Sequence, residues 1–439
     1  MRKLFSLTAA IAVIVSLTLS MSHVSAASHA AAGSTAPKRQ KGVTLGVWDW
    51  FCSTGQTTCP DRDAEVSVIK KWEKISGDKV AFPTNPSDHV SKMCTAAPAG
   101  QAPDVVGGPH DQVAVDVACQ VVSPIPAWAW TPAQKKGYIK AAVQASTLSG
   151  HTYAVPYAIE TTGLFYNKAL ISASAFRPAK GQKYLTWAKL IPELKKATPS
   201  GGIPLGWDQT NFYYDYAFIS GAGGYVFKFT KKGYDYNQVG LATAGAIKGL
   251  TFIKDLTNHG KYDLYPDSMT YDAAKPLFEA GKVPVFYTGP WDRPDFDKNN
   301  IKYGFQPLPS FDGKHPLRPF SGLQEYYINK YSAHKNEAAS LIAYLSAHLP
   351  QALFKSSGRI PVVSKVINSK AVQKDPILGG LAHAAVAAAP MPNIPEMGDV
   401  WTPAKSAITL VVKGQASPSD AAKAMVQQIK QAIAKAHGG

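Results

Sequence analysis

The sequence predicts an α/β protein in which mainly parallel sheets are flanked by helices. Its 439 residues are enough for two or three folding units. Hydrophobic residues make up 45% of the chain and charged residues 17%, which is typical of a globular protein and not of a disordered one. Strand-like and helix-like segments alternate along the chain, and this alternation favours parallel strands covered by helices.

The alternation begins close to residue 43. The apolar run 43–48 predicts a strand, and a helix should follow it and end at Gly77, because apolar residues recur at helical spacing. The segments 80–82 and 104–106 predict two further strands, which completes a β-α-β-α-β pattern. The helical positions are Val68, Ile69, Trp72 and Ile75.

The same scheme continues in the second half of the chain. Apolar stripes predict helices over 247–256 and 338–349, and Pro350 should end the second of them. The run 283–287 predicts a strand closed by the Gly289-Pro290 turn.

Two prolines mark expected helix starts near the end of the chain. Pro276 inside the helical pattern of 271–280 predicts a late start or a kink. Ser417 and Pro418 predict the beginning of the last helix, since serine caps a helix and proline suits its first turn. The apolar stripe of this helix is Met425, Ile429 and Ile433.

The N-terminus predicts export from the cytoplasm. Arg2 and Lys3 precede an apolar run over 4–19, and small residues end at Ala26, which is the pattern of a cleaved signal peptide over 1–26. The alternative, a membrane anchor, is weaker because the run is short of the roughly 20 residues that span a bilayer. Residues 27–41 are expected to be a flexible leader. The sequence has no cysteine near the cleavage site, so a lipid anchor is not expected. The mature chain is therefore expected to be extracellular or periplasmic.

The four cysteines predict disulfide bonds in an oxidising compartment. Four cysteines allow three pairings, of which Cys52 with Cys59 and Cys94 with Cys119 are favoured, since the first closes a short Gly/Thr-rich loop. A zinc site is the alternative, but the sequence has no Cys-x-x-Cys pair.

The chain is basic, with 46 Lys and Arg against 30 Asp and Glu and a formal charge of +16. The cations are spread thinly, without the dense basic helix that nucleic-acid binding favours, so no nucleic-acid partner is expected. The small number of carboxylates has two interpretations. It could be an adaptation to an acidic habitat, because few groups then destabilise the fold when they are protonated. The alternative is that the positive net charge attracts the protein to an anionic cell envelope.

Motifs of reaction chemistry are missing from the sequence. It contains no His-Glu-x-x-His, no Gly-x-Ser-x-Gly, no phosphate loop and no dinucleotide fingerprint. We therefore expect no cofactor, no metal ion and no catalytic residues. A glycoside hydrolase stays an alternative, since such an enzyme needs only two carboxylates whose separation a sequence does not reveal.

Aromatic residues beside turns are the strongest signal of function. Trp50 ends the first strand, Trp291 follows a Gly-Pro turn, and Trp401 follows a proline-rich stretch. Four aromatic residues crowd the segment 212–216. Core packing is the usual role of such residues, but open α/β sheets bind ligands beyond the ends of their strands. Flat aromatic faces there suit a sugar, which has apolar faces and hydroxyl edges.

Several motifs resemble bacterial maltose/maltodextrin-binding proteins, the extracellular solute-binding subunits of ABC importers. They occur in the order and at the spacings of that family, over nearly the whole chain from residue 42. The matching segments are Tyr153-Ala154-Val155-Pro156-Tyr157-Ala158-Ile159-Glu160, Leu164-Phe165-Tyr166-Asn167-Lys168, Gly223-Gly224-Tyr225-Val226-Phe227-Lys228, Gly289-Pro290-Trp291 and Met391-Pro392-Asn393-Ile394-Pro395.

The resemblance implies a two-lobed, periplasmic-binding-protein-like α/β fold, with a ligand cleft between lobes that close on the sugar. The N-terminal lobe is expected to comprise 42–158 plus 325–373, and the C-terminal lobe 159–324 plus 374–439. The implied protein is a monomeric binding protein and not an enzyme, with a malto-oligosaccharide-like sugar and an ABC permease as partners.

The resemblance also implies a set of sugar-binding positions. Trp291, Trp401 and Tyr213 correspond to residues that stack on sugar rings. Carboxylates and hydroxyls of the same set contact the sugar hydroxyls, and the remaining positions line the groove. The full set is Trp50, Asp111, Glu160, Asn211, Tyr213, Tyr271, Trp291, Met391, Trp401 and Lys405.

Departures from the family pattern leave the exact sugar open. Gly108 stands where the best-known members have a Trp, Gln112 and Lys405 replace an Arg, and Asn211 replaces an acid. Trp50 is the expected substitute for the missing Trp, with packing at a strand end as its alternative.

Two more positions keep an alternative. Glu160 could be a surface acid, and Lys405 a solvated residue of a helix face. The first loop, 51–61, differs from the family, and Asp88 alone remains of an expected acidic cluster. Another di- or oligosaccharide is therefore the alternative ligand.

Overall fold

The computed structural model describes residues 37–51, 59–83 and 89–438. The expected signal peptide, most of the leader, Cys52 and Asp88 lie outside these residues. The end of the leader contacts the fold, because Arg39 Nη1 donates a hydrogen bond of 2.7 Å to Ser340 Oγ.

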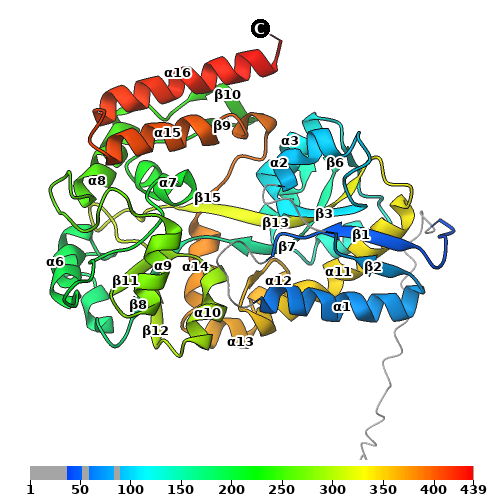
Figure 1. Ribbon diagram of the computed structural model, residues 1–439, viewed down its shortest axis with the longest axis horizontal. Coiled ribbons are helices and arrows are strands. Elements are labelled where there is room, and N and C mark those ends of the chain that lie inside the picture. The colour runs from blue at the N-terminus through cyan, green and yellow to red at the C-terminus, as the bar shows by residue number, and fades with distance from the viewer. Residues whose placement is uncertain (1–36, 52–58, 84–88, 439) are drawn as a thin grey trace, which may run out of the picture. The chain divides into compact units, whose positions relative to one another are not determined.

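The larger sheet has the strand order β14-β7-β13-β3-β1-β2, and β4 and β15 also pair with β13 (Figure 1). Buried apolar side chains of these strands form much of the core. The strands are β1 (Thr44–Trp48), β2 (Lys79–Ala81), β3 (Val105–Pro109), β4 (Val122–Ser123), β7 (Ala154–Glu160), β13 (Phe320–Asn329), β14 (Ile360–Pro361) and β15 (Ala389–Pro390).

The strand directions of this sheet are mixed. β1 pairs in parallel with both β2 and β3, as the β-α-β-α-β pattern predicts. β13 runs antiparallel to β3 and to β7, with Gln324 opposite Pro109 on one side and Ala158 on the other. The sheet is therefore α/β as expected but less uniformly parallel, because the strand that returns late in the chain enters it in the reverse direction.

The second main sheet has the order β11-β8-β12. β8 (Gly163–Asn167) lies in the centre and pairs antiparallel with β11 (Val285–Thr288) and with β12 (Tyr303–Gln306). All residues of β8 and β11 are buried. Two short hairpins complete the strands: β5 (Thr147–Leu148) with β6 (His151–Thr152), and β9 (Phe227–Thr230) with β10 (Gly233–Val239).

Helices cover both faces of the larger sheet (Figure 1). α1 (Pro60–Ser76) packs against α11 (Lys335–Ser356) on one face, while α2 (His89–Ala96) and α3 (His110–Ala118) pack together on the other. α1 ends at Gly77 as predicted, because glycine adopts the left-handed conformation there, with φ 81°. Ile75 is 72% exposed, so the expected apolar stripe ends one turn earlier, at Trp72.

The second sheet is surrounded by helices whose starts are capped by side chains. Thr186, Thr243 and Thr270 each accept a hydrogen bond from a backbone N–H of the first turn, which satisfies a donor that the helix leaves unpaired. These helices and their neighbours are α6 (Trp187–Ala197), α7 (Phe212–Gly221), α8 (Ala244–Leu256), α9 (Tyr271–Glu279), α10 (Arg293–Lys298), α14 (Leu378–Ala387), α15 (Trp401–Val412) and α16 (Pro418–Ala436).

Short helices and turns connect these elements. They are α4 (Pro132–Lys135), α5 (Lys140–Ala145), α12 (Ser364–Ile367), α13 (Lys370–Lys374), η1 (Ala173–Phe176), η2 (Pro290–Asp292) and η3 (Pro395–Met397).

The prediction that Pro350 ends its helix is wrong, because α11 continues to Ser356. Proline has no N–H to donate to the carbonyl four residues earlier, which belongs to Ser346. In the folded protein the Tyr138 hydroxyl donates to that carbonyl at 2.7 Å. A tertiary hydrogen bond thus replaces the one that the proline removes.

The late start expected before Pro276 is not observed, because α9 begins at Tyr271 after its Thr270 cap. At the C-terminus, the Ser417 cap is confirmed, and so is the buried stripe of Met425, Ile429 and Ile433.

The disulfide between Cys94 and Cys119 is confirmed and joins α2 to the residue after α3. It excludes these two cysteines as zinc ligands. The expected partner of Cys59 is Cys52, which lies outside the described residues.

Candidate ligand-binding site

Five aromatic residues from separate parts of the chain form one continuous cluster. Tyr213, at the start of α7, has its ring centroid 6.3 Å from that of Trp291 and 6.2 Å from that of Phe320. Phe320 in turn lies 6.3 Å from Trp401, at the start of α15, and Phe212 lies 5.9 Å from it. Trp291 and Trp401 are therefore linked through two intervening rings, and both are partly buried.

The Gly289-Pro290 turn explains the position of Trp291. A Cβ atom at Gly289 would lie 2.2 Å from the indole ring, so only glycine lets the ring fold back over the turn. The turn directly follows the buried strand β11, which fixes its place at the end of the second sheet.

Asp111 connects the cluster to the larger sheet. It lies in the first turn of α3 and is 2% exposed. Its Oδ2 atom accepts hydrogen bonds from Trp401 Nε1 at 3.1 Å and from Gln112 Nε2 at 3.2 Å. Its Oδ1 atom is buried and has no hydrogen-bond partner among the described residues. A buried carboxylate oxygen in this state can accept a hydrogen bond from a ligand.

Tyr213 and Met391 lie over the beginning of β13. A Cβ atom at Gly322 would lie 3.6 Å from the Tyr213 hydroxyl and 3.9 Å from Met391 Cε, so a glycine keeps this stretch of strand open. Burial raises the pKa of Tyr213, so its hydroxyl keeps its proton and can donate it. Asn211 caps α7, because its Oδ1 atom accepts a hydrogen bond of 3.1 Å from the Tyr213 N–H.

Tyr271 supports Trp291 through the residue after it. The Tyr271 hydroxyl donates to Asp292 Oδ1, and Thr288 Oγ1 donates to Asp292 Oδ2 at 2.5 Å. Burial raises the pKa of Asp292 to about 6. Tyr271 thus contacts the residue next to Trp291, and its hydroxyl donates its hydrogen bond to a protein carboxylate and not to the open site.

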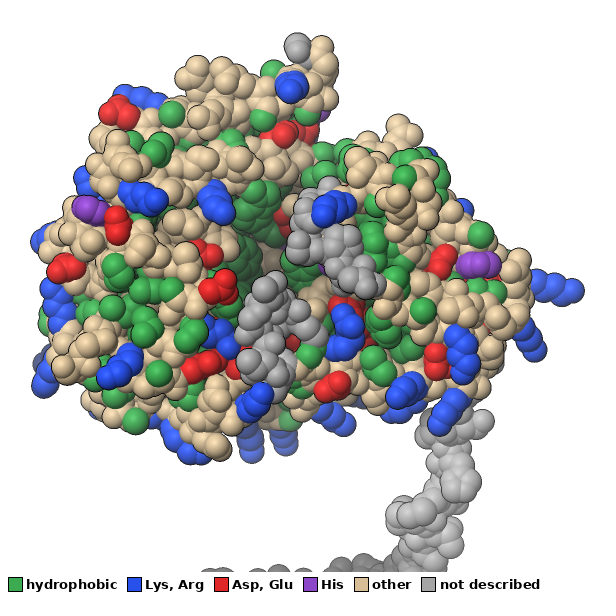
Figure 2. Space-filling model, viewed as in Figure 1, with side chains coloured by type: hydrophobic (Ala, Val, Ile, Leu, Met, Phe, Trp, Pro, Cys, Tyr) green, Lys and Arg blue, Asp and Glu red, His purple; other side chains and the backbone are tan. Residues whose placement is uncertain are grey.

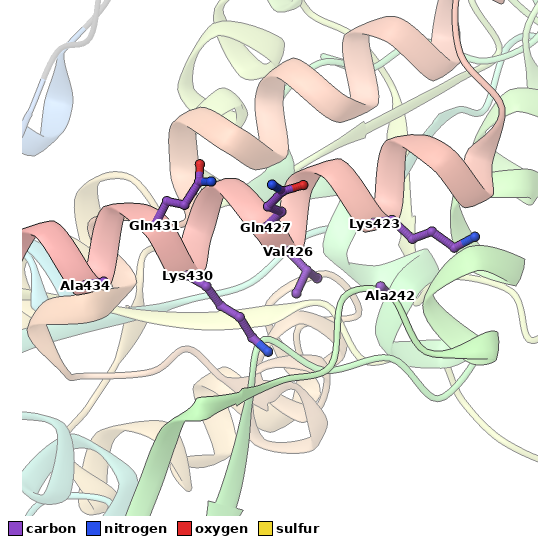
Figure 3. A pocket seen from close by; sticks show the side chains of 7 residues that line it. All are labelled: Ala242, Lys423, Val426, Gln427, Lys430, Gln431 and Ala434. Atoms are coloured by element: carbon purple, nitrogen blue, oxygen red, sulfur yellow. The ribbon is translucent and has the colours of Figure 1, made fainter. Parts of the chain in front are cut away.

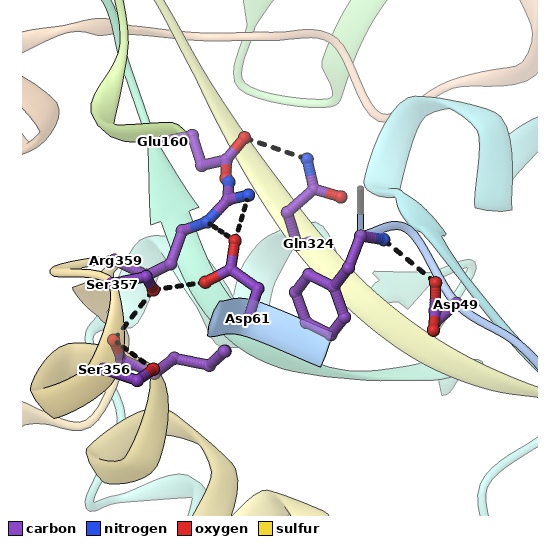
Figure 4. A network of polar contacts seen from close by, with 9 residues as sticks. Asp49, Asp61, Glu160, Gln324, Ser356, Ser357 and Arg359 are labelled. Atoms are coloured by element: carbon purple, nitrogen blue, oxygen red, sulfur yellow. Dashed lines mark hydrogen bonds and ion pairs between the residues drawn. The ribbon is translucent and has the colours of Figure 1, made fainter. Parts of the chain in front are cut away.

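Glu160 belongs to a buried polar network that the sequence did not reveal (Figure 4). Arg359 Nη1 forms an ion pair with Glu160 Oε1, and Gln324 Nε2 donates to Glu160 Oε2 at 3.0 Å. The other side of the Arg359 guanidinium donates to Asp61 Oδ2, at 2.8 Å from Nε and 2.6 Å from Nη2. Both Glu160 oxygens therefore have protein donors, and the residue is not the surface acid that was its alternative, being 5% exposed.

Lys405 and Trp50 lie at the margins of the site. Lys405 is exposed on α15 and lines a pocket of about 240 Å³ together with Asp208, Asn211 and Trp401. Trp50 is 37% exposed, and its ring centroid lies 5.4 Å from that of His89.

A larger pocket, of about 490 Å³, lies on the outer side of α16 (Figure 3). Lysine, glutamine, alanine and valine side chains line it, among them Lys423, Val426 and Lys430. It has neither aromatic rings nor carboxylates, so it does not fit the sugar-binding pattern. Figure 2 instead shows a hollow with hydrophobic side chains between the parts of the molecule that carry α7 and α2 in Figure 1.

Sequence reasoning missed Phe320 in the aromatic cluster, and Gln324 and Arg359 in the polar network around Glu160. The only available signal was Arg359 itself, a charged residue in the apolar stretch 358–363, which indicates a buried partner of opposite charge. Gln324 lies in a strand whose residues are all buried, and its partner Glu160 is distant in sequence. Among the described residues, no group of three or more His, Cys, Asp or Glu side chains is placed to hold a metal ion.

Two helix-flanked sheets, with an aromatic and carboxylate site where the chain passes between them, define a two-lobed binding protein. The chain belongs to the bacterial extracellular solute-binding protein family, whose model matches residues 61–351. Within the residues that the structure covers, no helix is long and apolar enough to cross a membrane.

Individual relatives agree with the family assignment. The galactooligosaccharide-binding protein of Bacillus subtilis is 28% identical over 92% of this chain and 93% of its own length. The maltose-maltodextrin binding protein of Alicyclobacillus acidocaldarius is 33% identical with a TM-score of 0.78, covering 88% of this chain and all of that structure. The maltotriose binding protein of Thermus thermophilus, solved with maltotriose, is 30% identical with a TM-score of 0.79, covering 89% and 100%.

Proposed function

We propose that this protein is the extracellular substrate-binding subunit of an ABC sugar importer, and that it binds maltose or malto-oligosaccharide-like sugars. The observation that carries the proposal is the continuous cluster from Trp291 to Trp401 with the unpaired Asp111 oxygen beside it. Ring faces remove the apolar faces of a sugar from water, while the carboxylate accepts a hydrogen bond from a sugar hydroxyl. The solved relatives that bind maltodextrin and maltotriose support the same ligand class.

The proposed mechanism is closure of two lobes on the sugar. Glu160 ends a strand of the first sheet and β8 begins the second sheet three residues later, so the chain changes lobe there. The other two proposed crossings lie near the start of β13 and near α13. A sugar held by α7 and η2 on one side and by Asp111 on the other favours the closed form, because only that form offers all contacts at once.

The proposed lobe boundaries are those that the sequence predicts. We keep 42–158 plus 325–373 as the N-terminal lobe and 159–324 plus 374–439 as the C-terminal lobe. The proposed set of sugar-binding residues is that of the sequence, with Trp291, Trp401, Tyr213 and Asp111 at its centre and Trp50 and Lys405 at its margins. The protein is proposed to be exported, to act as a monomer and to deliver its sugar to a membrane permease.

Sugar titration tests this proposal. Intrinsic tryptophan fluorescence and calorimetry should show saturable binding of maltose or maltotriose, because Trp291 and Trp401 change environment when a ring covers them. Trehalose and an unrelated sugar serve as controls. Failure of every α-glucoside to bind at millimolar concentration would reject the proposal.

A second ligand class is favoured by one relative, the galactooligosaccharide-binding protein of Bacillus subtilis. The sequence departs from the family pattern at Gly108, three residues before Asp111, and at Gln112, directly after it, so this side of the site is expected to differ. The same titration with a galacto-oligosaccharide separates the two ligands. Release of reducing sugar during the incubation would instead favour the hydrolase alternative, whereas binding without turnover agrees with transport.

A further inference from the structure

Gln324 faces the proposed sugar site from β13. Side chains two residues apart in a strand share a face, so Gln324 lies on the side of Gly322, over which Tyr213 and Met391 lie. On the neighbouring strand, Gln324 is paired with Pro109, two residues before Asp111. Gln324 therefore lies between Asp111 and Glu160, both of which belong to the proposed site.

The orientation of the Gln324 amide is determined by its partner. Glu160 is paired with Arg359 and so is an acceptor only, which means that the NH₂ group of Gln324 must face it. The amide oxygen then points to the other side, as Figure 4 shows. Exchanging the nitrogen and oxygen positions would set an oxygen against a carboxylate.

This amide oxygen has no hydrogen-bond partner among the described residues, although Gln324 is only 6% exposed. Buried polar atoms are nearly always hydrogen-bonded, so an unpaired acceptor at a ligand site indicates a donor supplied by the ligand or by water. Asp111 Oδ1 is a second unpaired acceptor in the same region. Both atoms need donors, and the hydroxyl groups of a sugar are donors.

We propose that Gln324 determines sugar specificity: it accepts a hydrogen bond from one hydroxyl of the bound sugar, while Glu160 and Arg359 hold its amide in place. This inference rests on the proposed function and adds a residue to its site. The oxygen is covered in the conformation described here, so the sugar must reach it while the lobes are apart. An isomer that lacks a hydroxyl at this point leaves the oxygen unpaired and is rejected.

The test uses calorimetry with methyl maltoside and its monodeoxy derivatives, each lacking one hydroxyl. The wild-type protein should bind one derivative about tenfold more weakly than the parent, because the Gln324 oxygen is then unpaired. Gln324→Met should bind the parent about tenfold more weakly than wild type does, and should bind that derivative no more weakly than the parent. Gln427→Met, an exposed position on α16, should bind every sugar like the wild type.

The outcomes separate this inference from others. A merely structural role weakens all sugars alike and keeps the derivative's penalty in Gln324→Met, which overturns the inference while leaving the proposed function intact. Unchanged affinity in Gln324→Met also overturns it. If Gln324→Met does not fold, Gln324→Asn, which withdraws the amide, carries the same comparison. A wild-type protein that binds no α-glucoside at millimolar concentration rejects the proposed function, and this inference with it.

Discussion

The aromatic cluster and the arginine network differ in how completely their groups are satisfied. Around Trp291 and Trp401 the rings are partly buried, and the neighbouring Asp111 keeps one oxygen unpaired. Around Arg359 the guanidinium is 6–7% exposed and lies between the carboxylates of Asp61 and Glu160. The cluster thus has polar atoms that can still bind a ligand, whereas most of the charged groups of the network already have protein partners.

This difference separates ligand binding from stability. Groups that already have protein partners hold the fold together, and their loss leaves a buried charge behind. Buried polar groups without partners destabilise the folded state and are available to a ligand. Glu160 is a motif position of the first kind, because both of its carboxylate oxygens already have protein partners.

The largest expected effect concerns buried carboxyl groups that have no arginine. Burial, with the nearby Asp111 carboxylate, raises the pKa of Glu325 from 4.5 to about 8, and burial raises that of Asp116 to about 7. The folded state therefore holds protons that the unfolded state releases. The stability from these groups is present in acid and is lost as pH rises through the window from about 4.5 to about 8.

We expect the free energy of unfolding to fall by on the order of several kcal/mol between about pH 5 and about pH 8. Denaturant unfolding at both pH values measures it, and Glu325→Gln should flatten the profile. His110 acts in the opposite sense, because burial lowers its pKa and its contribution is lost as pH falls below about 6.5. Equal slopes for wild type and Glu325→Gln would contradict this prediction. A folding midpoint that collapses between neutral and mildly acidic pH would contradict the acid-tolerance interpretation of the scarce carboxylates.

Arg359→Met tests the network directly. It leaves Asp61 and Glu160 buried without their cation, so the free energy of unfolding should fall by about 3–5 kcal/mol. Lys79→Met is the matched control, since its ion pair with Glu73 is 4.0 Å long and the two side chains are 70% and 18% exposed; the loss there should stay below about 1 kcal/mol. Similar losses of unfolding free energy in the two variants would contradict the claim that the buried arginine network stabilises the fold more than a surface ion pair does.

Trp291→Ala tests the aromatic cluster. Removing a stacking ring should weaken maltotriose binding by about 2 kcal/mol, which is roughly thirtyfold, with much less loss of stability than in Arg359→Met. Calorimetry measures the affinity and thermal unfolding the stability. Tyr331→Ala, at a tyrosine that is 53% exposed, is the control and should bind normally. Unchanged affinity in Trp291→Ala rejects the ring as a sugar platform.

Asp111→Asn is the mildest change. Trp401 Nε1 needs an acceptor, so the new amide must turn its oxygen to the indole and its NH₂ group to the open side. A sugar hydroxyl then loses its acceptor, and affinity should fall about tenfold without loss of the fold. Asp420→Asn, at an exposed acid of α16, should leave the affinity as it is. Tighter binding by Asp111→Asn would show that the sugar does not donate here.

Much of the fold could be predicted from local pattern. Strand β1, helix α1 up to Gly77 and the capped helix α16 follow from residues close in sequence, because propensity, periodicity and capping act over one or two turns. The same reasoning failed at Pro350, where the hydroxyl of Tyr138, more than two hundred residues earlier, accounts for the continued helix. The direction of β13 could not be predicted from local pattern either, because this strand pairs with segments that are distant in sequence.

The sequence by itself determined the kind of site: aromatic residues beside turns, few carboxylates and motifs of a sugar-binding family. Only the tertiary structure decided which of those groups are satisfied. Glu160 and Arg359 are 199 residues apart in sequence, and Trp401 and Asp111 are 290 apart. Whether a carboxylate meets a guanidinium, an indole N–H or nothing depends on such long-range contacts, and hydrogen bonding and burial are properties of the folded neighbourhood.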